Sequence, residues 1–325
     1  MPKAVIYTVL WVFFPLTVFA CETCAVFNSL DNQKRSADNV FLGVAYVYQL
    51  SDSTATPDLL ALQGLPGEKQ EIESHTTQLF ANYFFDERSS LQINLPIIYR
   101  NFNRFDGNSF VSGSEEGIGD ASLLYKYIPA QKYYSSFNYR SEIYGGLKLP
   151  TGNSDPLAEF EEAQLSQSLF RHGGPNGSLV GGDHIALGSG SYDFIFGGGF
   201  YSQYERFLLN IGVQAFLRTE GDHSYRFGNE VFWFLSGGYY LIVEKAHSLA
   251  LNLRFSGQSK GQDRLAGSKF DDSEELNMFL GPELIFSMGR NFLFQVAADF
   301  EVENDDSARE VAARQRFLST LTYRF

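Results

Sequence analysis

The chain has few cysteines, few basic residues and no long apolar run after its first twenty residues. Its 325 residues include only 2 Cys, and 25 Lys and Arg stand against 38 Asp and Glu, which gives a formal net charge of −13. This acidic balance argues against a nucleic-acid partner, because binding phosphate requires a basic face. Without further apolar blocks of about 20 residues, the chain cannot form a bundle of membrane-spanning helices.

Aromatic side chains and glycine are abundant instead. The chain has 31 Phe, 18 Tyr and 30 Gly, and 44% of its residues are hydrophobic, which excludes a disordered or fibrous chain. Its mean hydropathy is close to neutral, so the apolar residues are spread among polar ones.

The first twenty residues predict export from the cytoplasm. Lys3 precedes the apolar run 4–19, and Val18 and Ala20 put small residues at positions −3 and −1 before Cys21. These are the features of a secretory signal peptide. Pro15 interrupts the run and the run is short, which argues against a transmembrane anchor. A Cys at position +1 also leaves lipoprotein processing open, although Phe19 fits a lipobox poorly.

Beyond residue 38 the chain alternates between apolar and polar residues with a period of two, which is typical of strands. From Phe207 to Leu217 the odd positions are apolar, whereas Asn210 and Gln214 occupy even positions. The lengths suit tilted strands that cross a bilayer, and their even number suits a barrel. The predicted strands are 40–50, 75–86, 90–101, 117–128, 136–150, 189–203, 206–218, 228–242, 247–257, 274–287, 291–303 and 313–325.

The connections between these strands alternate between short and long. The long ones are 51–74, 102–116, 151–188, 219–227, 258–273 and 304–312. A transmembrane barrel with tight periplasmic turns and longer extracellular loops has this alternation, and a Greek-key sandwich gives no reason for it. We therefore predict an all-β chain: a signal peptide at 1–20, a periplasmic segment at 21–38, and at 39–325 a transmembrane antiparallel barrel of about 12 strands in the outer membrane of a Gram-negative bacterium.

Aromatic residues fall on the apolar face near the strand ends, where their rings suit the headgroup level of a membrane. They are Tyr46, Tyr48, Tyr83, Phe85, Tyr99, Tyr125, Tyr127, Trp233, Tyr239 and Tyr323. The last strand also carries Leu321, Tyr323 and Phe325 on one face, which resembles the signal recognised by the machinery that assembles outer-membrane barrels.

The inward face of the predicted strands carries charges of both signs. Charges inside a narrow lumen are costly unless they are hydrated or paired, so they predict either a water-filled pore or a salt-bridge network that closes the lumen. No ring of a single sign, which would imply ion selectivity, is present. The lumen candidates are Arg100, Asp120, Lys126, Arg140, Glu142, Lys148, Asp193, Arg218, Glu230, Arg254, Glu275, Glu283, Asp299, Glu301 and Arg316.

The longest connection, 151–188, is the candidate gate. Asp155 followed by Pro156 predicts an N-capped helix with Pro at its first position, and glycines at 173–174, 177 and 181–182 predict a flexible tail. Its 38 residues exceed what a passive loop needs. Two alternatives stay open: the loop folds into or over the mouth and constricts it, or it packs outside as a cap. The apolar gating candidates are Leu157, Phe160, Leu165 and Leu169.

Cys21 and Cys24 form a CxxC motif at the start of the predicted mature chain. Two Cys at this spacing can close a disulfide, contact a metal or exchange electrons, and Cys21 could also carry a lipid. No His follows Cys24, which excludes the c-type haem motif, and a structural zinc site would need a second pair of ligands. The choice between disulfide, metal and lipid stays open, and we predict no cofactor.

Three short motifs between residues 115 and 195 combine glycine with charged residues. They are Gly117-Ile118-Gly119-Asp120 leading to Lys126-Tyr127, Leu147-Lys148-Leu149-Pro150-Thr151-Gly152, and Gly188-Ser189-Gly190-Ser191-Tyr192-Asp193. These motifs resemble the outer-membrane transporters of the phenol-degradation MetA-pathway family. The resemblance implies a channel or transporter, and family members are often associated with aromatic or other hydrophobic compounds. Physically, glycines permit bends at strand ends, and Asp120, Lys126, Lys148 and Asp193 point into the lumen, where they could pair.

The sequence predicts no enzyme. Of the five His residues, none stands in a convincing base–nucleophile constellation, and the adjacent His223 and Ser224 point to opposite sides of an extended chain. Three functions remain: a passive channel for uptake or export of a small solute, aromatic or hydrophobic in character; a closed barrel whose CxxC serves a metal or redox partner; and a structural or surface-binding barrel. The predicted partners are outer-membrane lipid and lipopolysaccharide, the barrel-assembly machinery and the solute.

Overall fold

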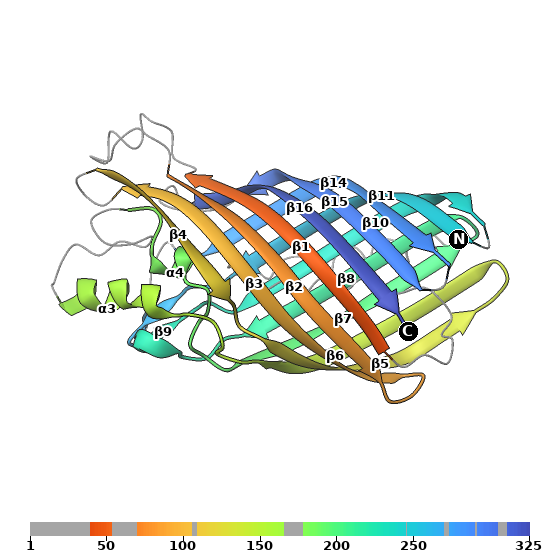
Figure 1. Ribbon diagram of the computed structural model, residues 1–325, viewed down its shortest axis with the longest axis horizontal. Helices are drawn as coiled ribbons and strands as arrows, with labels where there is room; N and C mark the ends of the chain where they lie inside the picture. The colour runs from red at the N-terminus through yellow and green to blue at the C-terminus, as the bar shows by residue number, and fades with distance from the viewer. Residues whose placement is uncertain are drawn as a thin grey trace, which may run out of the picture.

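The sheet closes on itself as an antiparallel barrel. The computed structural model describes residues 40–53, 70–105, 109–165, 178–244, 246–269, 273–289, 291–304 and 311–325. β1 (Val40–Ser53) pairs with both β16 (Val311–Arg324) and β2 (Glu71–Phe84), and β2 pairs in turn with β3 (Ser89–Phe105), so the sheet has no free end there. Figure 1 shows the tilted strands around a common axis.

The remaining strands follow one another around the barrel in chain order. They are β4 (Phe110–Ile118), β5 (Ser122–Tyr133), β6 (Phe137–Lys148), β7 (Asp193–Tyr204), β8 (Phe207–Leu217), β10 (Glu230–Val243), β11 (His247–Lys260), β14 (Glu275–Met288) and β15 (Phe292–Asn304). β4 and β5 are two halves of one wall strand, which gives the twelve strands that the sequence predicts.

The wall strand that contains β4 and β5 is broken at residues 119–121. Residues 97–105 of β3 pair with β4, and residues 89–94 of β3 pair with β5. The predicted continuous strand 117–128 is therefore wrong. A Cβ at Gly119 would meet Ile98 at 2.5 Å, so the backbone approaches β3 closely, and Asp120 leaves the ladder to bind other groups.

The strand boundaries differ from the predicted ones in two further places. The predicted loop 102–116 is mostly a hairpin, because β3 runs on to Phe105 and β4 begins at Phe110. The predicted start of a strand at 189 is also wrong. β7 begins at Asp193, since Ser189 and Ser191 are held by side-chain hydrogen bonds and not by the ladder.

The barrel is apolar outside and polar inside. Along β8, Phe207 is 60% exposed and Val213 50%, whereas Asn210 and Gln214 are buried. This is the reverse of a soluble protein, and it suits a wall that faces lipid on one side. The exterior also carries Tyr46, Tyr83, Phe85, Tyr99, Tyr125 and Tyr239 as exposed rings.

The long connections gather at one end, here called the outer end. They include η1 (Asp155–Leu157), α3 (Ala158–Leu165) and α4 (Gly182–Ile185) between β6 and β7, η3 (Asp222–Ser224) and β9 (Tyr225–Arg226) before β10, and β12 (Arg264–Leu265) with β13 (Ser268–Lys269) before β14. The C-terminus lies at the other end (Figure 1). None of the described helices is long and apolar enough to cross a membrane.

Candidate functional site at the outer mouth and in the lumen

Six successive strands place alternating charges at their outer ends. Lys148 ends β6, Asp193 begins β7, Arg218 follows β8, Glu230 begins β10, Lys260 ends β11 and Glu275 begins β14. We call these residues the charge belt. Nζ of Lys148 lies 2.8 Å from Asp193, and Arg218 lies 2.7 Å from Asp193 and 2.5 Å from Glu230. Lys260 lies 3.0 Å from Glu275. Pairing along the wall offsets the cost of enclosing each charge.

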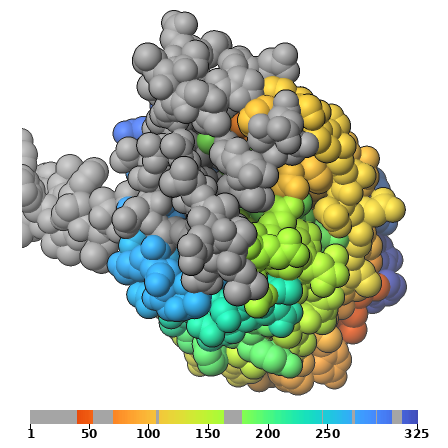
Figure 2. Space-filling model, turned by 90° about the vertical axis from the view of Figure 1, so that its left-hand side faces the viewer, coloured from red at the N-terminus to blue at the C-terminus, as the bar shows by residue number. Residues whose placement is uncertain are grey.

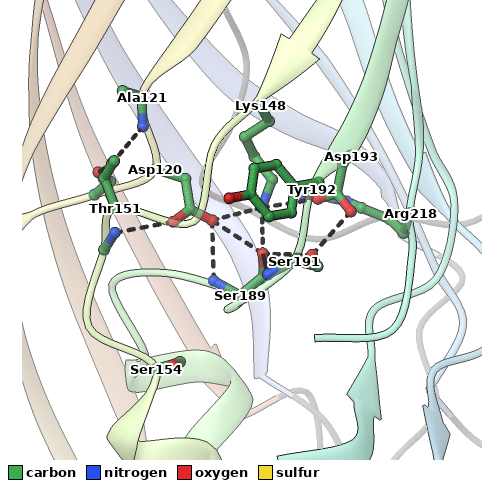
Figure 3. A network of polar contacts seen from close by, with 12 residues as sticks. Asp120, Ala121, Lys148, Thr151, Ser154, Ser189, Ser191, Tyr192, Asp193 and Arg218 are labelled. Carbon is green, nitrogen blue, oxygen red and sulfur yellow. Dashed lines mark hydrogen bonds and ion pairs between the residues drawn. The ribbon is translucent and has the colours of Figure 1, made fainter. Parts of the chain in front are cut away.

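Asp120 joins the charge belt to both stems of the loop 151–188. Its Oδ2 lies 2.5 Å from Nζ of Lys148 and accepts hydrogen bonds from the backbone N–H of Ser189 at 2.9 Å and from its hydroxyl at 3.0 Å. Its Oδ1 accepts from the N–H of Gly152 at 3.0 Å. One carboxylate therefore holds the first and the last turn of the loop together, as Figure 3 shows.

The two stems also meet backbone to backbone. The N–H groups of Leu187 and Gly188 both donate to the carbonyl of Asn153, at 3.0 and 2.9 Å. A Cβ at Gly152 would lie 2.8 Å from Cα of Gly188, and one at Gly188 would lie 2.7 Å from Oδ1 of Asp120. Both glycines therefore allow a close crossing that a larger residue would prevent. The three sequence motifs are therefore in contact with one another around Asp120.

On one side of the mouth, the returning half of the loop packs against β2 and β3. Leu179, Val180 and Ile185 form a buried cluster with Ile72 of β2, and Phe102 of β3 packs against it. Arg100 of β3 donates to the carbonyl of His184, and Oε1 of Gln70 accepts from the N–H of Leu179 at 3.0 Å. This segment is therefore held against the inner face of the barrel wall.

On the opposite side, the first half of the loop packs against two other connections. Leu157 and Phe160 are buried with Tyr225 and Phe227, which precede β10, and with Leu265, which follows β11; Ala186 of the returning half joins the same cluster. In the strand order, β10 and β11 stand across the barrel from β2 and β3. The described parts of the loop therefore bridge opposite walls of the mouth. Figure 2 looks onto this end, where the yellow-green start of the loop lies beside the turquoise residues that precede β10.

Polar contacts strengthen this bridge. Ser154 donates to Asp222 at 2.7 Å, Tyr225 donates to Asp263 at 2.6 Å, and Arg104 of β3 lies 2.5 Å from Glu159 of α3. Two of these contacts join the loop to the β8–β10 connection and to β3, and the third joins the β8–β10 connection to the β11–β14 connection.

The structure describes the side chains of only two of the four predicted gating residues. Leu157 and Phe160 are fully buried in the bridge, whereas the side chain of Leu165 and all of Leu169 lie outside the described residues. The predicted N-cap at Asp155 is wrong by one residue: Ser154 occupies the cap, and its hydroxyl bonds Asp222 instead of the helix. The glycines 181–182 are buried, since a Cβ at Gly182 would meet the carbonyl of Pro156 at 2.0 Å.

The lumen candidates from the sequence are enclosed by the barrel and mostly paired with neighbours. Below the charge belt, Lys126 lies 3.5 Å from Glu142, and Arg140 lies 2.8 Å from the same carboxylate. Arg316 and Arg254 approach Asp299 at 3.3 and 3.9 Å. Glu283 accepts from Ser236 and Asn252, and Glu301 binds Arg314 at the rim. The expected pairing of Asp120, Lys148 and Asp193 occurs, but Lys126 pairs with Glu142.

Several residues of the bridge carried no clear signal in the sequence. Gln70, Ile72, Tyr225 and Leu265 lie in connections or at strand ends, and each meets the loop only because the barrel brings distant segments together. The sequence does not predict Lys260 as a lumen charge, because the predicted strand ends at 257, whereas β11 continues to residue 260. A continued period-two count would have found Lys260.

The structure describes the predicted assembly signal but not the cysteine pair. Leu321 and Phe325 are exposed on the exterior at the inner end, and the ring of Tyr323 lies 4.8 Å from those of Phe292 and Phe325. Cys21 and Cys24 lie outside the described residues, so their role stays a prediction. Among the residues that the structure describes, no group of three or more His, Cys, Asp or Glu could hold a metal ion.

Solved structures are similar to this chain at low sequence identity. The crystal structure of an outer membrane channel from Pseudomonas putida F1 is similar over 92% of this chain and 100% of its own, with a TM-score of 0.62 and 16% identity. The beta domain of the Bordetella autotransporter BrkA covers 89% of this chain and 100% of its own, with a TM-score of 0.47 and 7% identity. No protein-family model and no curated protein matches the sequence.

The chain has the fold of a bacterial outer-membrane β-barrel. Its apolar exterior, closed twelve-stranded sheet and polar interior suit a membrane location. The resemblance of its motifs to the MetA-pathway family stays a prediction.

Proposed function

We propose that the chain is an outer-membrane channel that passes a small apolar or aromatic solute passively, and that the loop 151–188 gates its outer mouth. The observation that carries this proposal is the bridge: one buried cluster ties the loop to β2 and β3, and a second ties it to the connections before β10 and after β11, on the other side of the mouth. A barrel that only presents its outer surface needs no loop held between two sides of its mouth.

The interior supports a conduit. Its strands bury Asn, Gln, Arg, Lys, Asp and Glu side chains over most of their length, and such a lining is favourable only where partners or water satisfy it. Within the described part of the chain, Nδ2 and Oδ1 of Asn277 and Oδ1 of Asn210 have no hydrogen-bond partner. Groups of this kind suit a lumen that water enters. A barrel alone holds no energy source, so movement through it follows the concentration gradient.

The fold and the motifs point the same way. The Pseudomonas putida structure with the same architecture is described as an outer membrane channel. The three motifs that resemble the MetA-pathway transporters contact one another around Asp120, where the loop stems meet. The signal peptide at 1–20, the aromatic C-terminal strand for the assembly machinery and an outer surface facing lipopolysaccharide belong to the same proposal.

Liposome swelling tests the proposed transport. The refolded protein, checked for its folded state by the mobility shift that heating causes in barrels, is placed in liposomes and challenged with 4-hydroxybenzoate or with arabinose. A second chain carries a short Gly-Ser linker in place of 157–180. We expect both proteins to admit 4-hydroxybenzoate faster than arabinose, and the shortened chain to be faster for both. Swelling equal to that of empty liposomes for both solutes and both chains would overturn the proposal.

A further inference from the structure

Between the charge belt and the inner cluster of Lys126, Arg140 and Glu142, the wall from β5 to β10 carries an apolar patch. Leu124, Ile195 and Phe216 form a fully buried cluster, and Tyr144 and Phe232 pack against it. These residues alternate with the exposed ones of their strands, so they face inward. A solute that moves along the lumen passes from charges to aromatic rings and back to charges.

Aromatic rings in this region lie over glycines of the neighbouring strand. A Cβ at Gly197 would meet Cζ of Tyr144 at 2.3 Å, and one at Gly212 would meet Cε1 of Phe234 at 2.3 Å. Across the barrel, a Cβ at Gly43 of β1 would meet Cζ of Phe80 at 2.2 Å. The rings therefore occupy space that the side chain of a larger residue would fill at these positions.

The rings are only partly covered by other residues. Tyr144, Phe232, Phe234 and Phe80 are half-buried, whereas the belt residues above them are fully buried. In the strand order, β1 and β2 stand across the barrel from β8 and β10, so aromatic rings stand on opposed walls of the lumen. This arrangement suits an aromatic solute, because contacts between aromatic rings stabilise packing beyond the area they bury.

One polar group lies between the rings of the β6–β10 wall. Gln214 pairs in register with Gly197, which Tyr144 covers, and with Phe232. Its Oε1 accepts from the hydroxyl of Tyr144 at 3.0 Å, and its Nε2 has no hydrogen-bond partner among the residues that the structure describes, although Gln214 is only 5% exposed. An enclosed donor without a partner is unfavourable, and an acceptor brought by a solute would satisfy it once the rings part.

We propose that the middle of the lumen is a binding slot for a planar aromatic solute that carries a hydrogen-bond acceptor. The solute lies against Tyr144, Phe232 and Phe234, and its acceptor faces Nε2 of Gln214. This proposal rests on the proposed channel function and names the class of solute. It predicts preference for aromatic compounds with a carbonyl, carboxylate or phenolic oxygen over alicyclic molecules of the same size.

Calorimetric binding to the folded full chain in detergent tests the slot. The probes are benzamide and cyclohexanecarboxamide, which share the amide and differ in the ring. Gly212→Ala pushes the Phe234 ring into the slot. Its matched control is Gly257→Ala on the lipid-facing side, where the new Cβ meets Trp233 at 2.2 Å. Gln214→Leu removes the donor while the slot stays the same size.

We expect benzamide to bind more tightly than cyclohexanecarboxamide. Gly212→Ala should weaken benzamide binding at least tenfold, Gln214→Leu should weaken it about fivefold, as loss of one neutral hydrogen bond does, and Gly257→Ala should leave it unchanged. Equal binding of the two probes, or equal losses in Gly212→Ala and Gly257→Ala, would overturn the slot. If 4-hydroxybenzoate still enters liposomes in that case, the channel function stands and only the slot is wrong. If it does not enter, both are wrong.

Discussion

Replacing Asp120 by Asn should release the stems of the gating loop while the barrel stays folded. The carboxylate pairs with Lys148 at 2.5 Å and accepts from the N–H groups of Gly152 and Ser189 at 3.0 and 2.9 Å. Removing one partner of a buried ion pair costs about 3–5 kcal/mol. Lys148 keeps Asp193 at 2.8 Å, so the lower end, ~3 kcal/mol, applies. The cost falls on the closed stems, because Asp120 lies outside the strand ladder.

A cost of ~3 kcal/mol corresponds to an increase of about a hundredfold in the population with open stems. Amide hydrogen exchange reads this directly at Gly152 and Ser189, whose N–H groups the carboxylate accepts. The matched control is Asp299→Asn, which removes an equally buried carboxylate that pairs with Arg316 at 3.3 Å and accepts from Ser256 at 2.9 Å on the far wall. Equal exchange at the two stem amides in both variants would refute the assigned role of Asp120.

Three further changes probe the bridge and the assembly of the barrel. Leu157→Ala empties a fully buried position and should weaken loop docking by about 2–5 kcal/mol, seen as faster liposome swelling. Arg104→Gln breaks a pair whose side chains are 20% and 26% exposed, so it should cost less than about 1 kcal/mol and change swelling little, even in high salt. Phe325→Ala should lower the yield of heat-modifiable barrel in the outer membrane, without changing the unfolding of the purified protein, since the ring is 56% exposed. Slow swelling in Leu157→Ala, fast swelling in Arg104→Gln, or normal assembly of Phe325→Ala would each contradict the corresponding argument.

The barrel was predictable because alternation alone records which face meets lipid. Phe207, Ile211 and Val213 point outward and Asn210 and Gln214 inward, as the period of two requires. The alternation places the strand ends less precisely, because it continues beyond the part of each strand that crosses the membrane. β3, β4 and β11 therefore run further than predicted, and Lys260 was missed.

The break at Asp120 and the course of the loop were not predictable from local pattern. The residues around Asp120 alternate like those of a strand, and only the contacts with Gly152 and Ser189 draw it out of the ladder. The sequence marks Leu157 and Phe160 as apolar, but their partners Tyr225 and Leu265 lie in other connections of the barrel, and no local pattern pairs them. Such contacts depend on the order of strands around the barrel, which local spacing in the sequence does not contain.

Single-channel conductance in a planar bilayer tests the central claim most directly. The full chain is compared with the chain in which a short linker replaces 157–180, which removes Leu157, Phe160, Leu179 and Val180 from the bridge. Our account predicts small or rare openings for the full chain, and a steady, larger conductance for the shortened one. If both are equally silent although both are folded, or if shortening leaves an existing conductance unchanged, the loop does not gate this barrel.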